Sequence, residues 1–168
     1  MQCRNLLPAL GLLVSYAGPL SALEDDRKQP IHIKADHVEI DKRNGYSVYS
    51  GGVDINQGSL RIQGDSVTLY YEKGQLDKAV INGTPARFQQ QRDKDGQQVV
   101  SQANTMEYHA RRARLFLLDE ARVTQGANSF AGARIEYDIQ KSTVIANNSD
   151  SSSGRINAIL APANGSGQ

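Results

Sequence analysis

The sequence holds three histidines, His32, His37 and His109, which are the residues best suited to acid–base catalysis or metal binding near neutral pH. None of them stands in a spacing typical of a zinc site or a catalytic triad. His32 falls on the polar side of an alternating stretch, so we expect it to face solvent or a rim. The sequence therefore predicts no metal site.

Four carboxylates that could act in catalysis, Asp36, Asp41, Asp65 and Asp138, fall mainly at the expected ends of strands and at turns. Aspartate at such places often hydrogen-bonds the local backbone, so we assign these residues a structural role. Gly51-Gly52 is not a phosphate-binding loop, because no Lys-Ser/Thr pair follows it. We therefore expect neither enzymatic activity nor a cofactor. The net charge of +1 gives no reason to expect nucleic acid as a partner.

Apolar and polar residues alternate along most of the chain from Pro30 onward, and this period of two is typical of strands with one buried face. The clearest stretches are 31–36, 38–41, 53–56, 60–63 and 67–69. The expected turns are Asn44-Gly45, Gly51-Gly52, Gln57-Gly58, Gly64-Asp65, Lys73-Gly74, Asn82-Gly83 and Asp95-Gly96. The pattern predicts an all-β fold, as a sandwich, a barrel or a stacked β-structure.

The chain also repeats itself weakly. A shift of 68 positions places Gly64 over Gly132 and Gln57-Gly58 over Gln125-Gly126 without a gap. Apolar residues follow the same shift through the span 35–138. We interpret the pattern as an internal duplication, in which stacked units bury a shared interior.

The alternation places many apolar side chains on one face of the expected sheet. Such a face would form either an ordinary closed core or a groove whose apolar walls suit the acyl chains of a lipid. Its predicted members are Ile31, Ile33, Val38, Ile40, Val48, Val53, Ile55, Leu60, Ile62, Phe88, Met106, Tyr108, Phe116, Val123, Phe130, Ile135 and Tyr137.

The amino-terminal region is typical of a secretory signal peptide. An apolar run over 6–14 is followed by small residues, so we expect a signal over 1–22 that is cut after Ala17 or Ala22. A membrane anchor is the alternative, but the run is shorter than the roughly 20 apolar residues of a membrane span. Because Cys3 is the only cysteine, the mature chain would contain none.

The carboxyl-terminal region changes composition after Ala146. The stretch 147–154 is rich in asparagine and serine and is expected to form a flexible loop. Residues 155–160 would add one last edge strand. We therefore expect a folded domain over 23–162 and a disordered tail over 163–168.

Short motifs follow one another in a fixed order along the mature chain. They are Gln29-Pro30-Ile31-His32-Ile33-x-Ala35-Asp36, Tyr49-x-Gly51-x-Val53, Ile62-x-Gly64-Asp65, Gly83-Thr84-Pro85-Ala86-Arg87-Phe88-x-Gln90, Ala103-x-x-Met106-x-Tyr108, Ile135-x-Tyr137 and Gly154-Arg155-Ile156-x-x-Ile159-Leu160-x-Pro162. In order and spacing the chain resembles the LptA (OstA-like) family of periplasmic lipopolysaccharide transport proteins.

The resemblance implies a slightly twisted antiparallel β-jellyroll, open at both ends, without enzymatic activity. It implies a protein that binds lipopolysaccharide in the periplasm and bridges the two membranes. Such a protein accepts the lipid from LptC at the inner membrane and passes it to LptD at the outer membrane. By position, Ile31, Ile33, Phe88 and Tyr108 would contact the acyl chains of lipid A. The expected lipid-binding residues of the apolar face are Ile31, Ile33, Val38, Ile40, Val53, Ile55, Ile62, Phe88, Met106, Tyr108, Phe116, Val123, Phe130 and Ile135.

The open ends of such a sheet carry unpaired backbone groups, to which a neighbouring strand can add. Because these contacts join unlike ends, we expect head-to-tail self-association as well as pairing with LptC and LptD. The expected interface residues are Ile31, His32, Ile33, Ile156, Ile159 and Leu160.

Three alternatives stay open. An LptC-like subunit would keep its amino-terminal segment as a membrane anchor. A β-solenoid carbohydrate-active enzyme would need paired catalytic residues along one groove. A structural assembly protein would oligomerise without taking up lipid.

Overall fold

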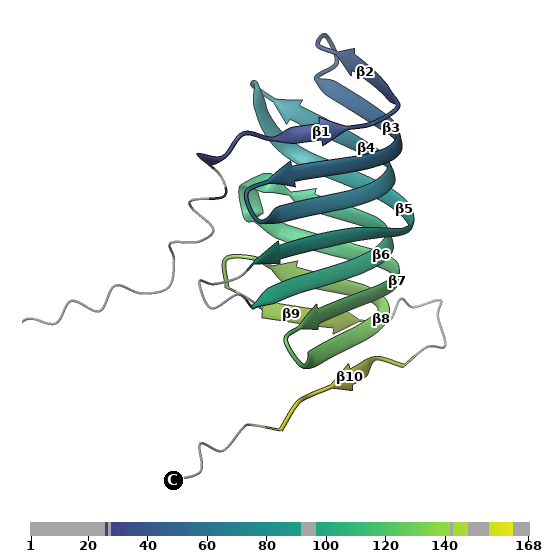
Figure 1. The fold of residues 1–168 in the computed structure, drawn as a ribbon, viewed down its shortest axis with the longest axis vertical. Coiled ribbons are helices and arrows are strands. Elements are labelled where there is room, and N and C mark those ends of the chain that lie inside the picture. The colour runs from purple at the N-terminus through teal and green to yellow at the C-terminus, as the bar shows by residue number, and fades with distance from the viewer. Residues whose placement is uncertain (1–25, 27, 92–96, 142, 148–154, 163–168) are drawn as a thin grey trace, which may run out of the picture.

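The computed structural model describes residues 26, 28–91, 97–141, 143–147 and 155–162, so the expected signal peptide, the expected tail and the turn at Asp95-Gly96 lie outside the described residues. Within these described residues, ten strands form one sheet (Figure 1). They are β1 (His32–Lys34), β2 (His37–Asp41), β3 (Tyr46–Gln57), β4 (Leu60–Glu72), β5 (Gln75–Gln91), β6 (Gln98–His109), β7 (Arg114–Gln125), β8 (Asn128–Asp138), β9 (Thr143–Asn147) and β10 (Asn157–Ile159).

From β3 to β8 each strand pairs with its neighbour in sequence, so the order of the sheet follows the order of the chain. At the two ends this rule changes, since β1 and β2 both pair with β3, and β9 and β10 both pair with β8. All of these pairs are antiparallel, which confirms the expected fold class. A short 3-10 turn, Ala110–Arg112, precedes β7. Within the described part of the chain, no helix has the length and apolar character needed to cross a bilayer.

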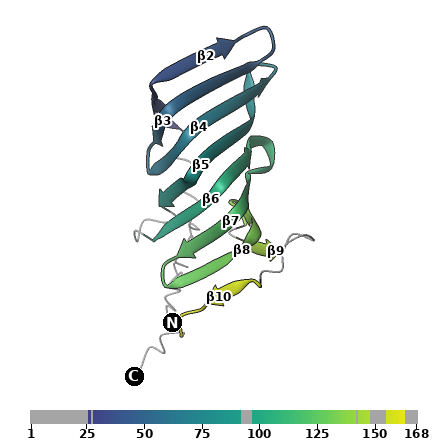
Figure 2. The same ribbon diagram turned by 90° about the vertical axis from the view of Figure 1, so that its right-hand side faces the viewer.

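The long strands bend near their middles. The pairing register shifts between residues 50 and 53 of β3, and comparable shifts follow between each successive pair of strands as far as β7 and β8. Extra residues at such β-bulges bend a strand and increase its twist. Because the bulges succeed one another across the sheet, the bends combine and the sheet curls around an interior (Figures 1 and 2).

Three of the expected turns are bulges inside strands. Gly51-Gly52 lies within β3, Gly64 within β4 and Gly83 within β5. A Cβ on Gly64 would stand 2.7 Å from the carbonyl oxygen of Asn82. One on Gly83 would stand 2.6 Å from the backbone nitrogen of Ala86. The prediction of turns here was wrong, because these glycines serve the bend of a continuing strand. The expected turns that do join strands are Asn44-Gly45, Gln57-Gly58 and Lys73-Gly74.

The strand bounds bear out the internal repeat. Shifted by 68 positions, β3 coincides with β7 at both ends, and β4 begins where β8 begins. The same shift lays β1 and β2 on the single strand β6, and it lays β5 on β9 and β10 together. An interior strand of one unit is therefore represented by two short edge strands at the matching end of the other.

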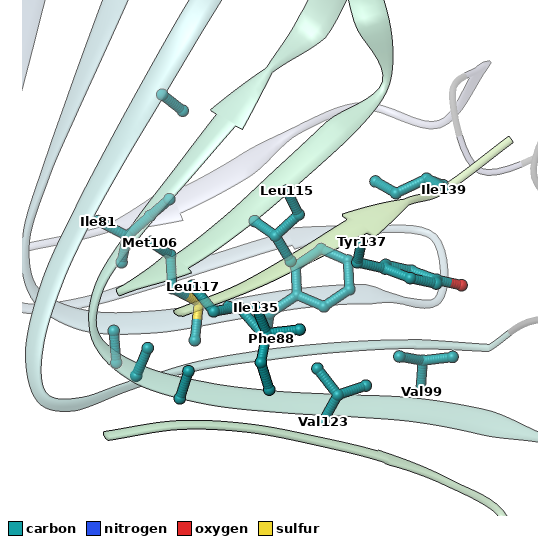
Figure 3. Close-up of a cluster of buried hydrophobic side chains, with 14 of the residues drawn as sticks. Ile81, Phe88, Val99, Met106, Leu115, Leu117, Val123, Ile135, Tyr137 and Ile139 are labelled. Carbon is teal, nitrogen blue, oxygen red and sulfur yellow. The ribbon is translucent and has the colours of Figure 1, made fainter. Parts of the chain in front are cut away.

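Apolar side chains from β3 to β8 meet inside the curled sheet. Figure 3 shows Ile81, Phe88 and Met106 projecting into this interior together with side chains of the neighbouring strands. The largest fully buried side chains are Ile81, Met106, Leu115, Leu117 and Ile135. Burial of each such side chain contributes roughly 1.5–3 kcal/mol.

Candidate functional site

An apolar cavity of about 140 Å³ lies inside the sheet, between β1 and the strands β3 to β7. Ile55, Ile62, Phe88 and Tyr108 are part of its wall. The cavity is smaller than the roughly 300–1,000 Å³ of sites that enclose a drug-sized ligand. A lipid with several acyl chains would therefore fit only after the interior opens further.

Most of the predicted apolar face lies in this interior. The members that line the cavity are Ile31, Ile33, Ile55, Leu60, Ile62, Phe88, Met106 and Tyr108. The members that belong to the adjoining core are Val53, Val123, Phe130, Ile135 and Tyr137.

Phe116 lies on the outer face instead, between the inward-facing Leu115 and Leu117. Its ring meets the ring of His109 edge to face, with 5.2 Å between centroids. The guanidinium of Arg134 stands over it, 5.0 Å from the ring centroid. The prediction of an interior position was wrong, because the run of four apolar residues at 115–118 leaves the phase of the alternation undefined.

The expected interior positions near β2 also need correction. Val48 lies on the outer face, between the inward-facing Ser47 and Tyr49. Val38 pairs with Tyr49 and Ile40 pairs with Ser47, so both share the inner face. They are nevertheless 51% and 60% exposed, because β2 is an edge strand.

Several residues that line the cavity were not predicted from the alternation in the sequence. In β4, Ile62 and Val67 both face the cavity although an odd number of positions separates them. The bulge beside Gly64 changes the phase of the alternation, so a single parity fails across it. In β5, the alternation that includes Ala79 and Ile81 is the sequence signal that could have predicted these two cavity residues. The unassigned cavity residues are Asp26, Gln57, Val67, Leu69, Leu76, Ala79, Ile81, Gln90, Leu115 and Ile139.

Asp26 forms a polar rim of the cavity beside the turn between β3 and β4. Its carboxylate accepts hydrogen bonds from the backbone nitrogen of Ser59 at 2.8 Å and from the Ser59 hydroxyl at 2.6 Å. The Gln90 amide donates a longer bond of 3.3 Å to the same carboxylate. The rim combines the acidic side chain of Asp26 with neutral polar groups, and these groups hydrogen-bond one another.

A second hollow, of about 540 Å³, lies beside the turns that join β2 to β3 and β4 to β5. The backbone and side chain of Asn44 donate hydrogen bonds to the carboxylate of Asp41, and these bonds fix the first turn. The same hydrogen bonds lower the pKa of Asp41 below its ordinary value. The backbone nitrogen of Tyr71 donates a 2.8 Å bond to the carbonyl oxygen of Gly45, which ties the two turns together. The basic residues of this hollow are Lys42, Arg43 and Lys73.

The predicted interface residues lie at the two opposite ends of the sheet. β1 and β10 each pair with one strand only among those that the structure describes. Ile31, Ile159 and Leu160 are 57%, 63% and 67% exposed, which is unusual for large apolar side chains. Ile33 is half-buried, because it also lines the cavity. The other predicted interface residues, both exposed, are His32 and Ile156.

The three histidines lie on three different strands. His32 and His37 are exposed on the edge strands β1 and β2, whereas His109 lies 3.4 Å from Glu107 on β6. In the described ranges no group of three His, Cys, Asp or Glu side chains could hold a metal ion. The chemistry that the interior offers is apolar contact.

An open antiparallel sheet that curls around an apolar interior, with an unpaired edge at each end, is the architecture of a protein that binds an apolar ligand. The chain belongs to the LptA family of lipopolysaccharide transport proteins, since residues 32–143 match the family described as LptA/(LptD N-terminal domain) LPS transport protein. The resemblance found in the motifs is thereby confirmed.

Individual relatives agree with this assignment. The chain is 35% identical over 147 residues to the lipopolysaccharide export system protein LptH of Pseudomonas aeruginosa. This alignment covers 86% of this chain and 84% of that protein. It is 31% identical over 139 residues to the lipopolysaccharide export system protein LptA of Escherichia coli, with coverage of 82% and 74%. The crystal structure of LptH, described as the LptA homologous periplasmic component of the lipopolysaccharide transport device, superposes with a TM-score of 0.76 at 34% identity. It covers 82% of this chain and 99% of that one.

Proposed function

We propose that the protein is a periplasmic bridge subunit that carries lipopolysaccharide from the inner-membrane extraction complex to the outer-membrane translocon. The acyl chains of lipid A travel inside the curled sheet. The observation that carries this proposal is the apolar cavity among Ile62, Phe88 and Tyr108 in a member of a lipopolysaccharide transport family, because acyl chains need apolar walls. The description of the relative LptH as a periplasmic component supports residues 1–22 as an export signal.

The energetics favour a sheltered path. A buried methylene is worth roughly 0.8 kcal/mol, so exposing one chain of about twelve carbons to water costs on the order of 10 kcal/mol. A lipid with several such chains cannot cross an aqueous compartment unprotected. The bridge needs only sites of similar affinity in series, and the net direction comes from the ATP-driven extraction at the inner membrane.

A continuous path requires that successive subunits join at their open ends. β1 and β2 form one end of the sheet and β9 and β10 the other. Unpaired edges of this kind accept a neighbouring strand by backbone hydrogen bonding. The end near Ile31 would meet LptC or a preceding copy, and the end near Ile159 would meet a following copy or LptD.

Site-specific photo-crosslinking tests the path of the lipid. A photoreactive residue at Phe88 or Tyr108 should capture lipopolysaccharide, because both side chains line the cavity. The matched control is Arg61, which lies on the outer face of β4, is 52% exposed and pairs with Asp54. Equal capture at Arg61 and at the two interior positions would reject an internal lipid path.

A further inference from the structure

The hydroxyl of Ser47 is buried without a hydrogen-bond partner among the described residues. The residue is 2% exposed and lines the second hollow, beside the turns that join β2 to β3 and β4 to β5. A buried hydroxyl without a partner is costly, and nearly all buried polar groups are paired. The hydroxyl oxygen has almost no accessible surface, so a polar atom of a ligand in the hollow would become its partner when the wall around Ser47 opens.

The hollow also presents positive charge that no described acidic residue neutralises. Lys42, Arg43 and Lys73 line it, and their side chains make no ion pair with the residues that the structure describes. Its two acidic residues are already engaged. The carboxylate of Asp41 accepts hydrogen bonds within its own turn, and Glu72 pairs with an arginine outside the hollow. The free charge facing a ligand is therefore basic.

The hollow adjoins the apolar cavity through the pairing of β3 and β4. Ser47, in the hollow, lies opposite Leu69, which lines the cavity. Tyr49, also in the hollow, lies opposite Val67, another cavity residue. A single molecule with an anionic end and an apolar end could thus occupy both spaces. The acidic rim at Asp26 offers no comparable site.

We propose that the second hollow is a headgroup subsite for a phosphorylated glycolipid whose acyl chains occupy the apolar cavity. The inference rests on the proposed function, because it assigns the headgroup of the same transported lipid. Lys42, Arg43 and Lys73 bind the phosphate oxygens by charge-assisted hydrogen bonds. When the wall around it opens, the Ser47 hydroxyl donates a hydrogen bond to a carbonyl or hydroxyl oxygen where the sugar joins the acyl chains.

The first test compares charge removal inside and outside the hollow in the full mature chain. The triple variant Lys42→Ala, Arg43→Ala, Lys73→Ala should bind bisphosphorylated lipid A at least about tenfold more weakly, by fluorescence titration. It should also lose the preference for bisphosphorylated over dephosphorylated lipid A. The control triple variant removes the same charge from exposed positions away from the hollow and should stay within about twofold. Its substitutions are Arg87→Ala, Arg122→Ala and Lys141→Ala.

The second test uses the two buried hydroxyls that lack partners. Ser47→Ala should raise the melting temperature of the free protein yet weaken lipid binding about threefold to tenfold, because the removed hydroxyl bonds only the ligand. Ser101→Ala should also raise the melting temperature but leave binding unchanged, since Ser101 lines neither the hollow nor the cavity. Equal binding by the two variants would overturn the role of Ser47.

Further measurements distinguish a lipid headgroup from free phosphate as the bound anion. They also distinguish failure of the headgroup subsite from failure of the proposed lipid path. Displacement of the lipid by inorganic phosphate alone at low millimolar concentration would identify a free-phosphate site and overturn the headgroup assignment. Unchanged binding by the hollow's triple variant, with binding lost in Tyr108→Asp, would overturn the headgroup subsite and leave the lipid path intact. Unchanged binding by Tyr108→Asp as well would overturn the proposed function itself.

Discussion

The guanidinium of Arg61 donates a 2.6 Å hydrogen bond to the carboxylate of Asp54 across β3 and β4. In the adjacent register position Ile55 and Ile62 stand opposite each other, on the face that lines the cavity. The two neighbouring pairs therefore separate a polar outer surface from an apolar interior within one step along each strand.

Ile33→Asp should weaken lipid binding at least about tenfold, because it places an unpaired charge in the wall of the cavity. The measurement is titration with lipopolysaccharide, after circular dichroism has shown a folded sheet. His32→Asp changes the neighbouring exposed residue of the same strand and should bind normally. Normal binding by a folded Ile33→Asp variant would remove this residue from the site.

Phe116→Ala should cost about 1–2 kcal/mol of unfolding free energy, because the ring loses its contacts with His109 and Arg134. Lipid binding should not change, since Phe116 lies on the outer face. Urea denaturation measures the first effect and lipid titration the second. Phe88→Ala is the comparison that should lower both, because Phe88 is buried against the cavity.

Gly64→Ala should destabilise the protein by roughly 1–3 kcal/mol, because the new Cβ would meet the backbone oxygen of Asn82 at 2.7 Å. Gly132→Ala is the matched control at the equivalent position of the repeat. There the nearest atom stands 3.6 Å away, in ordinary contact. Thermal unfolding compares the two variants. Equal stability would mean that β4 and β5 do not approach closely at Gly64.

Deletion of residues 155–168 should weaken self-association, because it removes β10 and the exposed Ile159 from the end of the sheet. Light scattering over a range of protein concentrations measures the effect. Deletion of 163–168 alone leaves β10 in place and should not alter the oligomers. Undiminished oligomers after the longer deletion would show that β10 is not the joining edge.

Asp54→Asn should reduce stability by up to about 1 kcal/mol at neutral pH and have little effect in acid. The hydrogen bond from Arg61 is the main cause that lowers the pKa of Asp54 below its ordinary value of 3.8. A carboxyl whose pKa is lower when folded stabilises the fold above the unfolded value, and this contribution is lost as the pH falls through the folded pKa. Urea midpoints of both proteins between neutral and acid pH should therefore converge. A constant difference would exclude an ionic origin.

The fold and much of the candidate site were predictable from the sequence. Alternation placed Ile55, Ile62 and Phe88 correctly on one face, because side-chain direction along a strand depends only on the local backbone. The expected edge at 155–160 also proved to contain a strand. Prediction failed at Phe116, where consecutive apolar residues hide the phase, and at Gly64, where an expected turn is a bulge.

The sequence by itself determined the alternation, the repeat of 68 positions and the family motifs, since all three are local or periodic properties of the chain. Only the tertiary structure decided which glycines bend a strand, because that depends on how closely a distant backbone approaches. It also decided that the cavity lies among β1 and β3 to β7, and that Lys42, Arg43 and Lys73 surround a hollow beside it. Those groups come together only when separate hairpins pack side by side in the curled sheet.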